Sequence, residues 1–261
     1  MWRPTPSLLT ETLGILMLVF IWLYPVWRFC RFTNPLALIF IPIIHMLAYV
    51  VCQRLLFRPG EVLKNEDLLY SWNYYRWWFL ERLWSINYYW LQHILGTQFY
   101  NAYLQLCGAN IGRHAHIYTA LIEAPWLLEV GQSTFIDDGV MLSNLSYHDQ
   151  TFKLHSIRIG SFCSLDMRSV LYHGVDIERG VTVFGRAVLA PFEITDKGNC
   201  CCEEICLGSG TNLGNECTLM PGTRLAPNTM VGNLTRITRK TSCINADTVL
   251  LGIPASRMPF V

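Results

Sequence analysis

The feature that most constrains the fold is an aliphatic residue that recurs every six positions from residue 111 onward. Six residues of α-helix turn through about 600°, so a helix would scatter these side chains around its surface. An even period keeps them on one face of a strand. The repeat therefore predicts short strands whose aliphatic side chains point inward, at Ile111, Ile117, Val130, Ile136, Leu142, Ile159, Leu165, Leu171, Ile177, Val183, Leu189, Leu207, Leu213, Leu219, Leu225, Val231 and Ile237, continuing through Cys243 to Val249.

A second pattern accompanies the first. A small or β-branched residue often stands four places after the aliphatic one, as at Ser169, Val181 and Thr223, and glycine often follows it directly, as at Gly160. A short strand and a tight turn together use six residues, and stacking such units buries the aliphatic positions in one column. Residues 108–261 are therefore predicted to form a parallel β-helix.

The register of the repeat slips in one place and weakens in another. Leu142 and Ile159 are 17 positions apart, five more than two hexads, so residues 143–156 are predicted to project as a loop. Leu189 and Leu207 are 18 apart, which fits three hexads, but residues 190–206 match the pattern poorly. The sequence leaves open whether that stretch is a coil or a loop.

The first sixty residues are predicted to be a transmembrane helical hairpin. Residues 8–27 contain one charge, Glu11, and residues 35–53 contain none. Each stretch is about as long as a membrane-spanning helix requires. The cationic residues slightly favour the end shared with the β-helix, which predicts a multi-pass membrane protein with a cytosolic β-helix.

Residues 61–107 are predicted to be helices that lie at the bilayer surface. Thirteen aromatic side chains fall between residues 70 and 100, and Trp and Tyr favour the membrane boundary. Only 15% of the chain is charged and the formal net charge is +1, so we expect a lipid bilayer as a partner and no nucleic acid.

The hexads and the closing Gly252, Ile253, Pro254 and Ala255 make the sequence similar to the left-handed β-helix acyltransferase superfamily. It is most similar to the membrane-bound C-terminal units of epsilon-poly-lysine synthetase and related nonribosomal peptide synthetase terminal proteins. The matching segments are GTQFYNAYLQLCGANIG at 96–112, VGQSTFIDDGVML at 130–142 and YHDQTFKLHSIRIGSFCSL at 147–165. No adenylation or carrier domain is expected in these 261 residues, which hold one unit where the synthetase has three.

The resemblance implies a left-handed β-helix, a homotrimer and an acyl or aminoacyl transfer to an amine or hydroxyl. The donor would be a thioester of coenzyme A or of a phosphopantetheine carrier protein or synthetase. A histidine in a projecting loop commonly serves such enzymes as general base. His148, in the predicted loop, is the first candidate, and His173, on the following coil, is the second.

The sequence is also compatible with other functions. The β-helix could be a non-catalytic scaffold at the membrane. A zinc-dependent hydratase like the γ-class carbonic anhydrases would need a second histidine five positions before His173, where Arg168 stands. Cys200, Cys201, Cys202 and Cys206 lack the paired spacing of a zinc site, so no metal is expected and the thiols are expected to be reduced.

Overall fold

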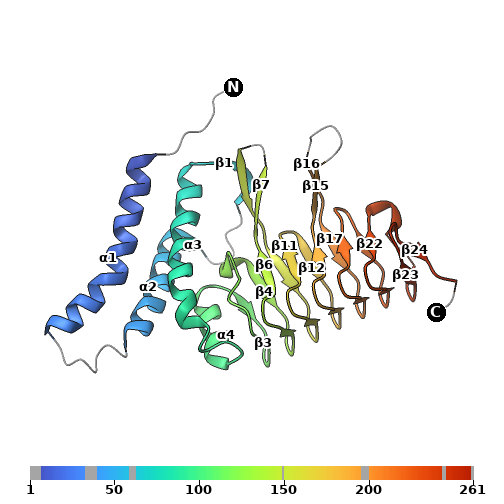
Figure 1. Ribbon diagram of the computed structural model, residues 1–261, viewed down its shortest axis with the longest axis horizontal. Helices are drawn as coiled ribbons and strands as arrows, with labels where there is room; N and C mark the ends of the chain where they lie inside the picture. Colours follow the sequence, from blue (N-terminus) through green and yellow to red (C-terminus); the bar gives the residue numbers. More distant parts are fainter. Residues whose placement is uncertain are drawn as a thin grey trace.

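The chain folds into a layer of helices followed by a long β-helix (Figure 1). The computed structural model describes residues 7–32, 40–58, 63–148, 150–194, 200–242 and 245–259. The predicted inward position Cys243 lies outside these residues. The coils stack along the longest dimension of the molecule, and the helices gather at the end where the first coil begins.

Three parallel sheets form the sides of the described β-helix. The first contains β2 (Asn110–Ile111), β4 (Leu128–Val130), β9 (Ile157–Ile159), β12 (Val175–Ile177), β17 (Ile205–Leu207) and β20 (Arg224–Leu225). The second contains β3 (His116–Ile117), β5 (Phe135–Ile136), β10 (Ser164–Leu165), β13 (Thr182–Val183), β18 (Asn212–Leu213), β21 (Met230–Val231), β23 (Val249–Leu251) and the antiparallel β24 (Ser256–Arg257). The third contains β6 (Met141–Ser143), β11 (Val170–Tyr172), β14 (Val188–Leu189), β19 (Thr218–Leu219) and β22 (Arg236–Ile237).

The predicted inward register is confirmed from Ile111 to Ile237. Every predicted aliphatic residue in that range is buried, and equivalent residues pair between neighbouring coils, as Leu171 does with Leu142 and Leu189. The prediction is wrong at the last position, because Leu250 and not Val249 pairs with Val231 and is buried. Val231 and Leu250 are 19 positions apart, one more than three hexads.

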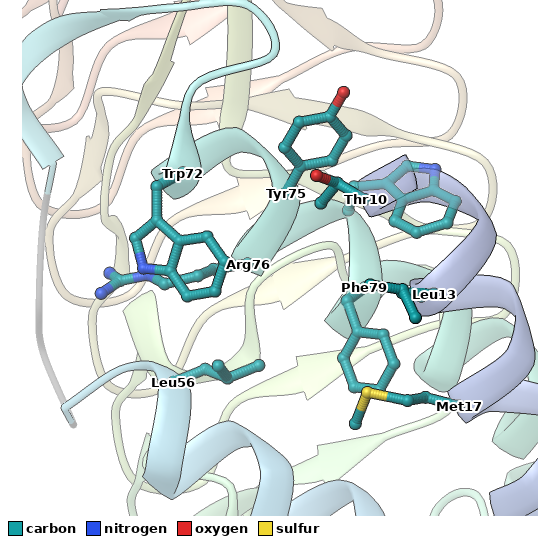
Figure 2. A pocket seen from close by; sticks show the side chains of 10 residues that line it. Thr10, Leu13, Met17, Leu56, Trp72, Tyr75, Arg76 and Phe79 are labelled. Atoms are coloured by element: carbon teal, nitrogen blue, oxygen red, sulfur yellow. The ribbon is translucent and has the colours of Figure 1, made fainter. Parts of the chain in front are cut away.

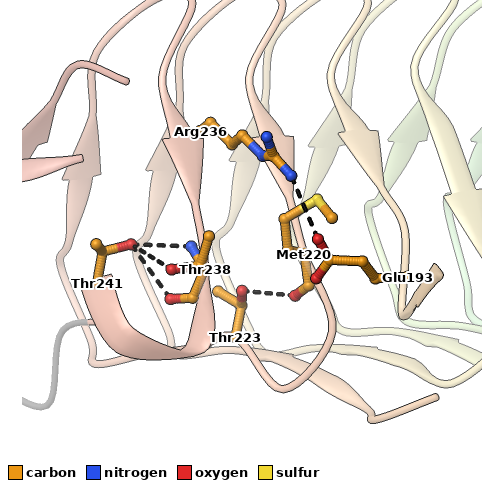
Figure 3. Close-up of polar contacts among 6 residues, drawn as sticks. All are labelled: Glu193, Met220, Thr223, Arg236, Thr238 and Thr241. Carbon is orange, nitrogen blue, oxygen red and sulfur yellow. Dashed lines mark hydrogen bonds and ion pairs between the residues drawn. The ribbon is translucent and has the colours of Figure 1, made fainter. Parts of the chain in front are cut away.

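The small residues of the second pattern lie at the corners between sheets, where their hydroxyls have a specific role. The buried Thr223 donates its hydroxyl to the carbonyl of Met220 at 2.7 Å, and the buried Ser169 bonds to the carbonyl of Asp166 at 2.9 Å. Figure 3 shows the Thr223 bond beside the bonds of Thr241 to Thr238, where the 3₁₀ helix Arg239–Thr241 begins. The hydroxyls satisfy turn carbonyls that the corners would otherwise leave without a partner.

The position after the inward residue requires glycine, because neighbouring coils lie too close together there for a Cβ atom. A Cβ atom on Gly160 would lie 2.6 Å from the carbonyl carbon of Glu178 in the next coil. This close approach explains the glycines that the sequence places at equivalent positions.

The N-terminal helices are α1 (Leu8–Phe32), α2 (Ile41–Leu56), α3 (Trp72–Leu91) and α4 (Gln98–Leu106). α4 closes the open end of the β-helix, since Tyr100 donates to the carbonyl of Thr119 at 2.8 Å and Asn101 to that of Ala115 at 2.7 Å. α3 packs on the first coil, and its aromatic side chains form the interior between α2 and the β-helix.

Among the described residues, one helix is long and apolar enough to cross a membrane, the segment Leu8–Arg31 of α1. α2 has 16 residues and buries Ile41, His45, Tyr49, Val50 and Gln53. The rest of the predicted second span, residues 35–39, lies outside the described residues. The segment predicted as interfacial helices also contains a strand, β1 (Leu63–Leu68).

Two antiparallel hairpins project from the described β-helix, both at the corner between the third and first sheets. The predicted loop is the hairpin of β7 (Leu145–His148) and β8 (Thr151–Leu154), to which β1 adds a third strand. Residues 190–206 hold a second hairpin, β15 (Phe192–Ile194) and β16 (Cys200–Cys202), so this stretch leaves the β-helix. We name them the first and second hairpins.

Candidate functional site

The two hairpins flank one coil that turns the same corner without an insertion. That coil passes from β11 to β12 through His173 and Gly174. The plain corner, from Leu171 to Ile177, uses 6 residues. The corners with hairpins are longer, with 17 residues from Leu142 to Ile159 and 18 from Leu189 to Leu207. His173 therefore lies in a recess between two projecting walls.

His173 is buried between aromatic groups of the two hairpins. Its ring stacks on His155, at the base of the first hairpin, with centroids 5.5 Å apart, and on Phe192 of the second hairpin at 6.3 Å. Its Nε2 atom is buried and has no hydrogen-bond partner. Burial, then the neighbouring His155 and Lys153, lower the pKa of His173 to about 4, so the imidazole is neutral near pH 7.

This lowered pKa predicts acid sensitivity. An unfolded histidine with a pKa of 6.5 binds a proton before the folded one does, so stability is fully present above pH 6.5 and falls as the pH drops toward about 4. At about 1.4 kcal/mol per pKa unit, lowering the pH from 7 to 5 should cost about 2 kcal/mol through this residue. Urea unfolding at the two pH values should show a smaller loss for His173→Gln than for the unsubstituted protein, and an equal loss would contradict the assignment.

A cleft of about 320 Å³ opens between the hairpins. Its floor is formed by outward side chains of the third sheet and its walls by the hairpins. The lining residues are Glu123, Met141, Ser143, Leu145, Ser146, Tyr147, Tyr172, Phe192 and Cys202. We name it the hairpin cleft. His173 lies behind this lining, because Phe192 both stacks on His173 and faces the cleft.

A second cleft, of about 390 Å³, continues from the first toward α3. It shares Glu123 and Met141 with the hairpin cleft. Its other lining residues come from α3 and the first coil and are Glu81, Trp84, Ser85, Tyr88, Ala120, Leu121 and Ile122. Together the two clefts form an elongated depression, here named the trough, with Glu123 at its middle.

Glu123 is a partly buried carboxylic acid at the middle of the trough. One carboxylate oxygen, Oε2, accepts hydrogen bonds from the Ser143 hydroxyl at 2.9 Å and from the Leu145 amide at 3.2 Å. Burial nevertheless raises the pKa of Glu123 above its usual range, because desolvation outweighs these two bonds. A carboxyl group whose pKa is raised in a largely apolar cleft is a candidate to accept or donate a proton. The sequence pattern gave no sign of it, since Glu123 falls in an irregular part of the first coil.

The backbones of the two candidate bases, His148 and His173, lie at different levels of the corner. His148 is the last residue of β7 and pairs with Thr151 next to the turn, whereas Leu145 pairs with Leu154 at the base near His155. Three residues of strand, about 10 Å, thus separate the backbone of His148 from the base of the hairpin. His173 instead stacks on His155.

The described residues contain no group of three or more His, Cys, Asp or Glu side chains arranged to hold a metal ion. Arg168, at the position where a γ-class carbonic anhydrase would need a histidine, is an exposed turn residue with a φ of 57°.

The β-helix is similar to crystal structures of AntD, an N-acyltransferase from Bacillus cereus. The complex of AntD with dTDP and 3-hydroxybutyryl-CoA matches with a TM-score of 0.51 and 16% identity, over 60% of this chain and 86% of AntD. A variant of AntD in complex with dTDP-4-amino-4,6-dideoxyglucose and coenzyme A gives the same TM-score of 0.51 and 16% identity, over 60% of this chain and 87% of AntD.

A hexapeptide-repeat acetyltransferase from Vibrio cholerae, VCA0836, matches with a TM-score of 0.42 and 12% identity, over 68% of this chain and 88% of its own. No family model matches the chain, and no curated protein matches it in sequence. The likeness to AntD shows that residues beyond the helical layer have the β-helix fold found in that N-acyltransferase.

Proposed function

We propose that the protein is a membrane-anchored acyltransferase that moves an acyl group from a coenzyme A thioester to an amine or hydroxyl in the trough. The observation that carries the proposal is the partly buried carboxyl of Glu123 at the middle of the trough, whose pKa is raised by desolvation. The fold shared with AntD, which has been crystallised with 3-hydroxybutyryl-CoA, supports this choice of chemistry and donor.

In the proposed reaction the acceptor nitrogen or oxygen attacks the thioester carbonyl. The carbon–sulfur bond breaks, the thiolate leaves, and a protein group removes the proton of the attacking atom. Glu123 is placed for that role because it lines both halves of the trough. His148 and His173 are the alternative bases. His148 would act in the site of a neighbouring protomer that the first hairpin reaches, and His173 would act after Phe192 has moved away from it.

The left-handed homotrimer implied by the family resemblance is part of this proposal, since clefts between adjacent β-helices would complete the site. Closed cyclic symmetry is the usual arrangement of identical chains. Light scattering of the detergent-solubilised protein should give the mass of three chains after subtraction of the micelle. A single monodisperse monomer would contradict the trimer.

The resemblance to synthetase terminal units leaves an aminoacyl group on a phosphopantetheine carrier as an alternative donor. The discriminating experiment offers the purified protein acetyl-CoA, longer acyl-CoA thioesters and an aminoacyl-carrier thioester, each with primary amines and alcohols as acceptors. Thiol release that depends on acceptor, with the matching product mass, supports transfer. Absence of product from every donor favours the scaffold function.

A further inference from the structure

The helices α1, α2 and α3 form a layer whose orientation relative to the β-helix is fixed. Figure 1 shows them side by side, each running across the direction in which the coils stack, with α1 outermost. The Trp84 indole of α3 donates to the carbonyl of Ala120 in the first coil at 3.0 Å. The amide of Ser7 donates to the hydroxyl of Tyr75 at 2.7 Å, and His45 Nε2 lies 3.2 Å from the carbonyl of Trp22. These contacts join α1, α2, α3 and the first coil into one unit.

This arrangement conflicts with an α1 that stands upright across a bilayer. Because α3 and the first coil lie beside α1, they would enter the hydrocarbon core with it (Figure 1). Arg82 is more than half exposed on α3, and Arg113 and His114 are exposed on the first coil. Charged side chains such as these arginines are costly at the bilayer centre, and lipid-exposed turns are not tolerated there.

Exposed apolar side chains follow α1 through most of its length. Leu9, Leu16 and Leu23 recur every seven residues on one stripe of α1 and are 73%, 59% and 48% exposed. α2 adds exposed apolar side chains at Ile43, Leu47, Val51 and Leu55. Exposed apolar side chains in this number mark a membrane or protein contact.

A cleft of about 360 Å³ between α1, α2 and α3 is also lined mostly by apolar side chains. Figure 2 shows Leu13 and Met17 of α1 facing Phe79 of α3, with Leu56 of α2 across the cleft. In water such a cleft would leave apolar surface hydrated, whereas an acyl chain can fill it. Cationic Arg76, also in the lining, suits the phosphate of a lipid headgroup.

We propose that the helical layer lies flat in one leaflet of a lipid bilayer, with the α1 side embedded and the β-helix axis along the membrane normal. This deepens the membrane attachment proposed above and rests on it. It replaces the two-span hairpin by a one-sided contact, in which apolar area is buried in the interface without carrying the first coil into lipid. Three protomers related by a three-fold axis along the membrane normal could all contact the same leaflet.

The test compares the depths of three labels on one stripe of α1. Leu9→Cys, Leu16→Cys and Leu23→Cys, each made in a Cys30→Ser background, are labelled with an environment-sensitive fluorophore. The labelled full chains are placed in vesicles of phosphatidylcholine and phosphatidylglycerol, and the signal of the labelled background protein is subtracted. Nitroxide lipids carrying the quencher near the headgroup or near the chain end report the depth. Leu234→Cys, on an exposed coil turn far from the helices, is the matched control.

A flat layer predicts nearly equal depths for the three α1 labels and no quenching of the label at position 234. An upright segment Leu8–Arg31 would place positions 9 and 23 about 21 Å apart along the normal at 1.5 Å per residue, with position 9 near the headgroups and positions 16 and 23 deep in the hydrocarbon core. Such a profile, or the absence of quenching at all three sites, overturns the proposal. Acyl transfer is assayed in detergent without vesicles. A failure of the proposed acyltransferase function is therefore distinguished from a failure of the flat-layer proposal.

Discussion

Leu171→Asp should unfold the β-helix or destabilise it by several kcal/mol. Leu171 is fully buried and packs in one column with Leu142 and Leu189. An aspartate there would place a charge in an apolar interior without a partner, which is among the most destabilising of single substitutions. Thermal unfolding followed by circular dichroism measures the effect.

The matched control is Val170→Asp, one residue earlier on the same strand. Val170 points to the other face of the sheet and is partly exposed, so water can solvate the new carboxylate. We expect a loss below about 1 kcal/mol. Equal effects of the two substitutions would contradict the assigned register.

Glu123→Gln should reduce acyl transfer by about 10² to 10⁴ fold, the range typical of a lost proton acceptor. The amide has nearly the same shape and its oxygen can still accept from Ser143 and Leu145, so folding and oligomeric state should persist. Because the pKa of Glu123 is raised, the rate of the unsubstituted enzyme should rise with pH through a value above that of an ordinary carboxyl group.

Glu81→Gln provides the control for this substitution. Glu81 lines the same trough, but its carboxylate is paired with Arg82 at 3.0 Å. Its replacement should leave the rate within a few fold. If Glu123→Gln keeps full activity while His148→Ala or His173→Ala loses about 10² fold or more, that histidine is the base.

The β-helix was predictable because each coil repeats one physical requirement. Leu171 and its equivalents must point inward, Gly160 must allow a close approach of coils, and corner residues such as Thr223 must be small. Only the end of the repeat was misassigned, since Leu250 follows Val231 by one residue more than three hexads and is the residue in the core.

The candidate site was less predictable because it depends on contacts between segments distant in sequence. Periodicity located the first hairpin but could not show that β1 pairs with β8, or that His173 stacks on His155. The second hairpin was hidden because its length equals whole hexads. Glu123 belongs to no repeat, and its environment arises only when β6 and the first hairpin surround it.

The most direct test of the central claim, that an acyl-CoA thioester is bound with its acyl group in the hairpin cleft, is affinity labelling with bromoacetyl-CoA. Cys202 is exposed and lines that cleft, whereas Cys201 is the adjacent residue on β16 and is absent from its lining. The thiolate of Cys202 would displace bromide from the bound acyl group and form a thioether. The account predicts modification of Cys202 by mass spectrometry, with protection by excess coenzyme A and little reaction at Cys201. Modification that coenzyme A does not prevent, or protected modification only at cysteines outside the cleft, would contradict it.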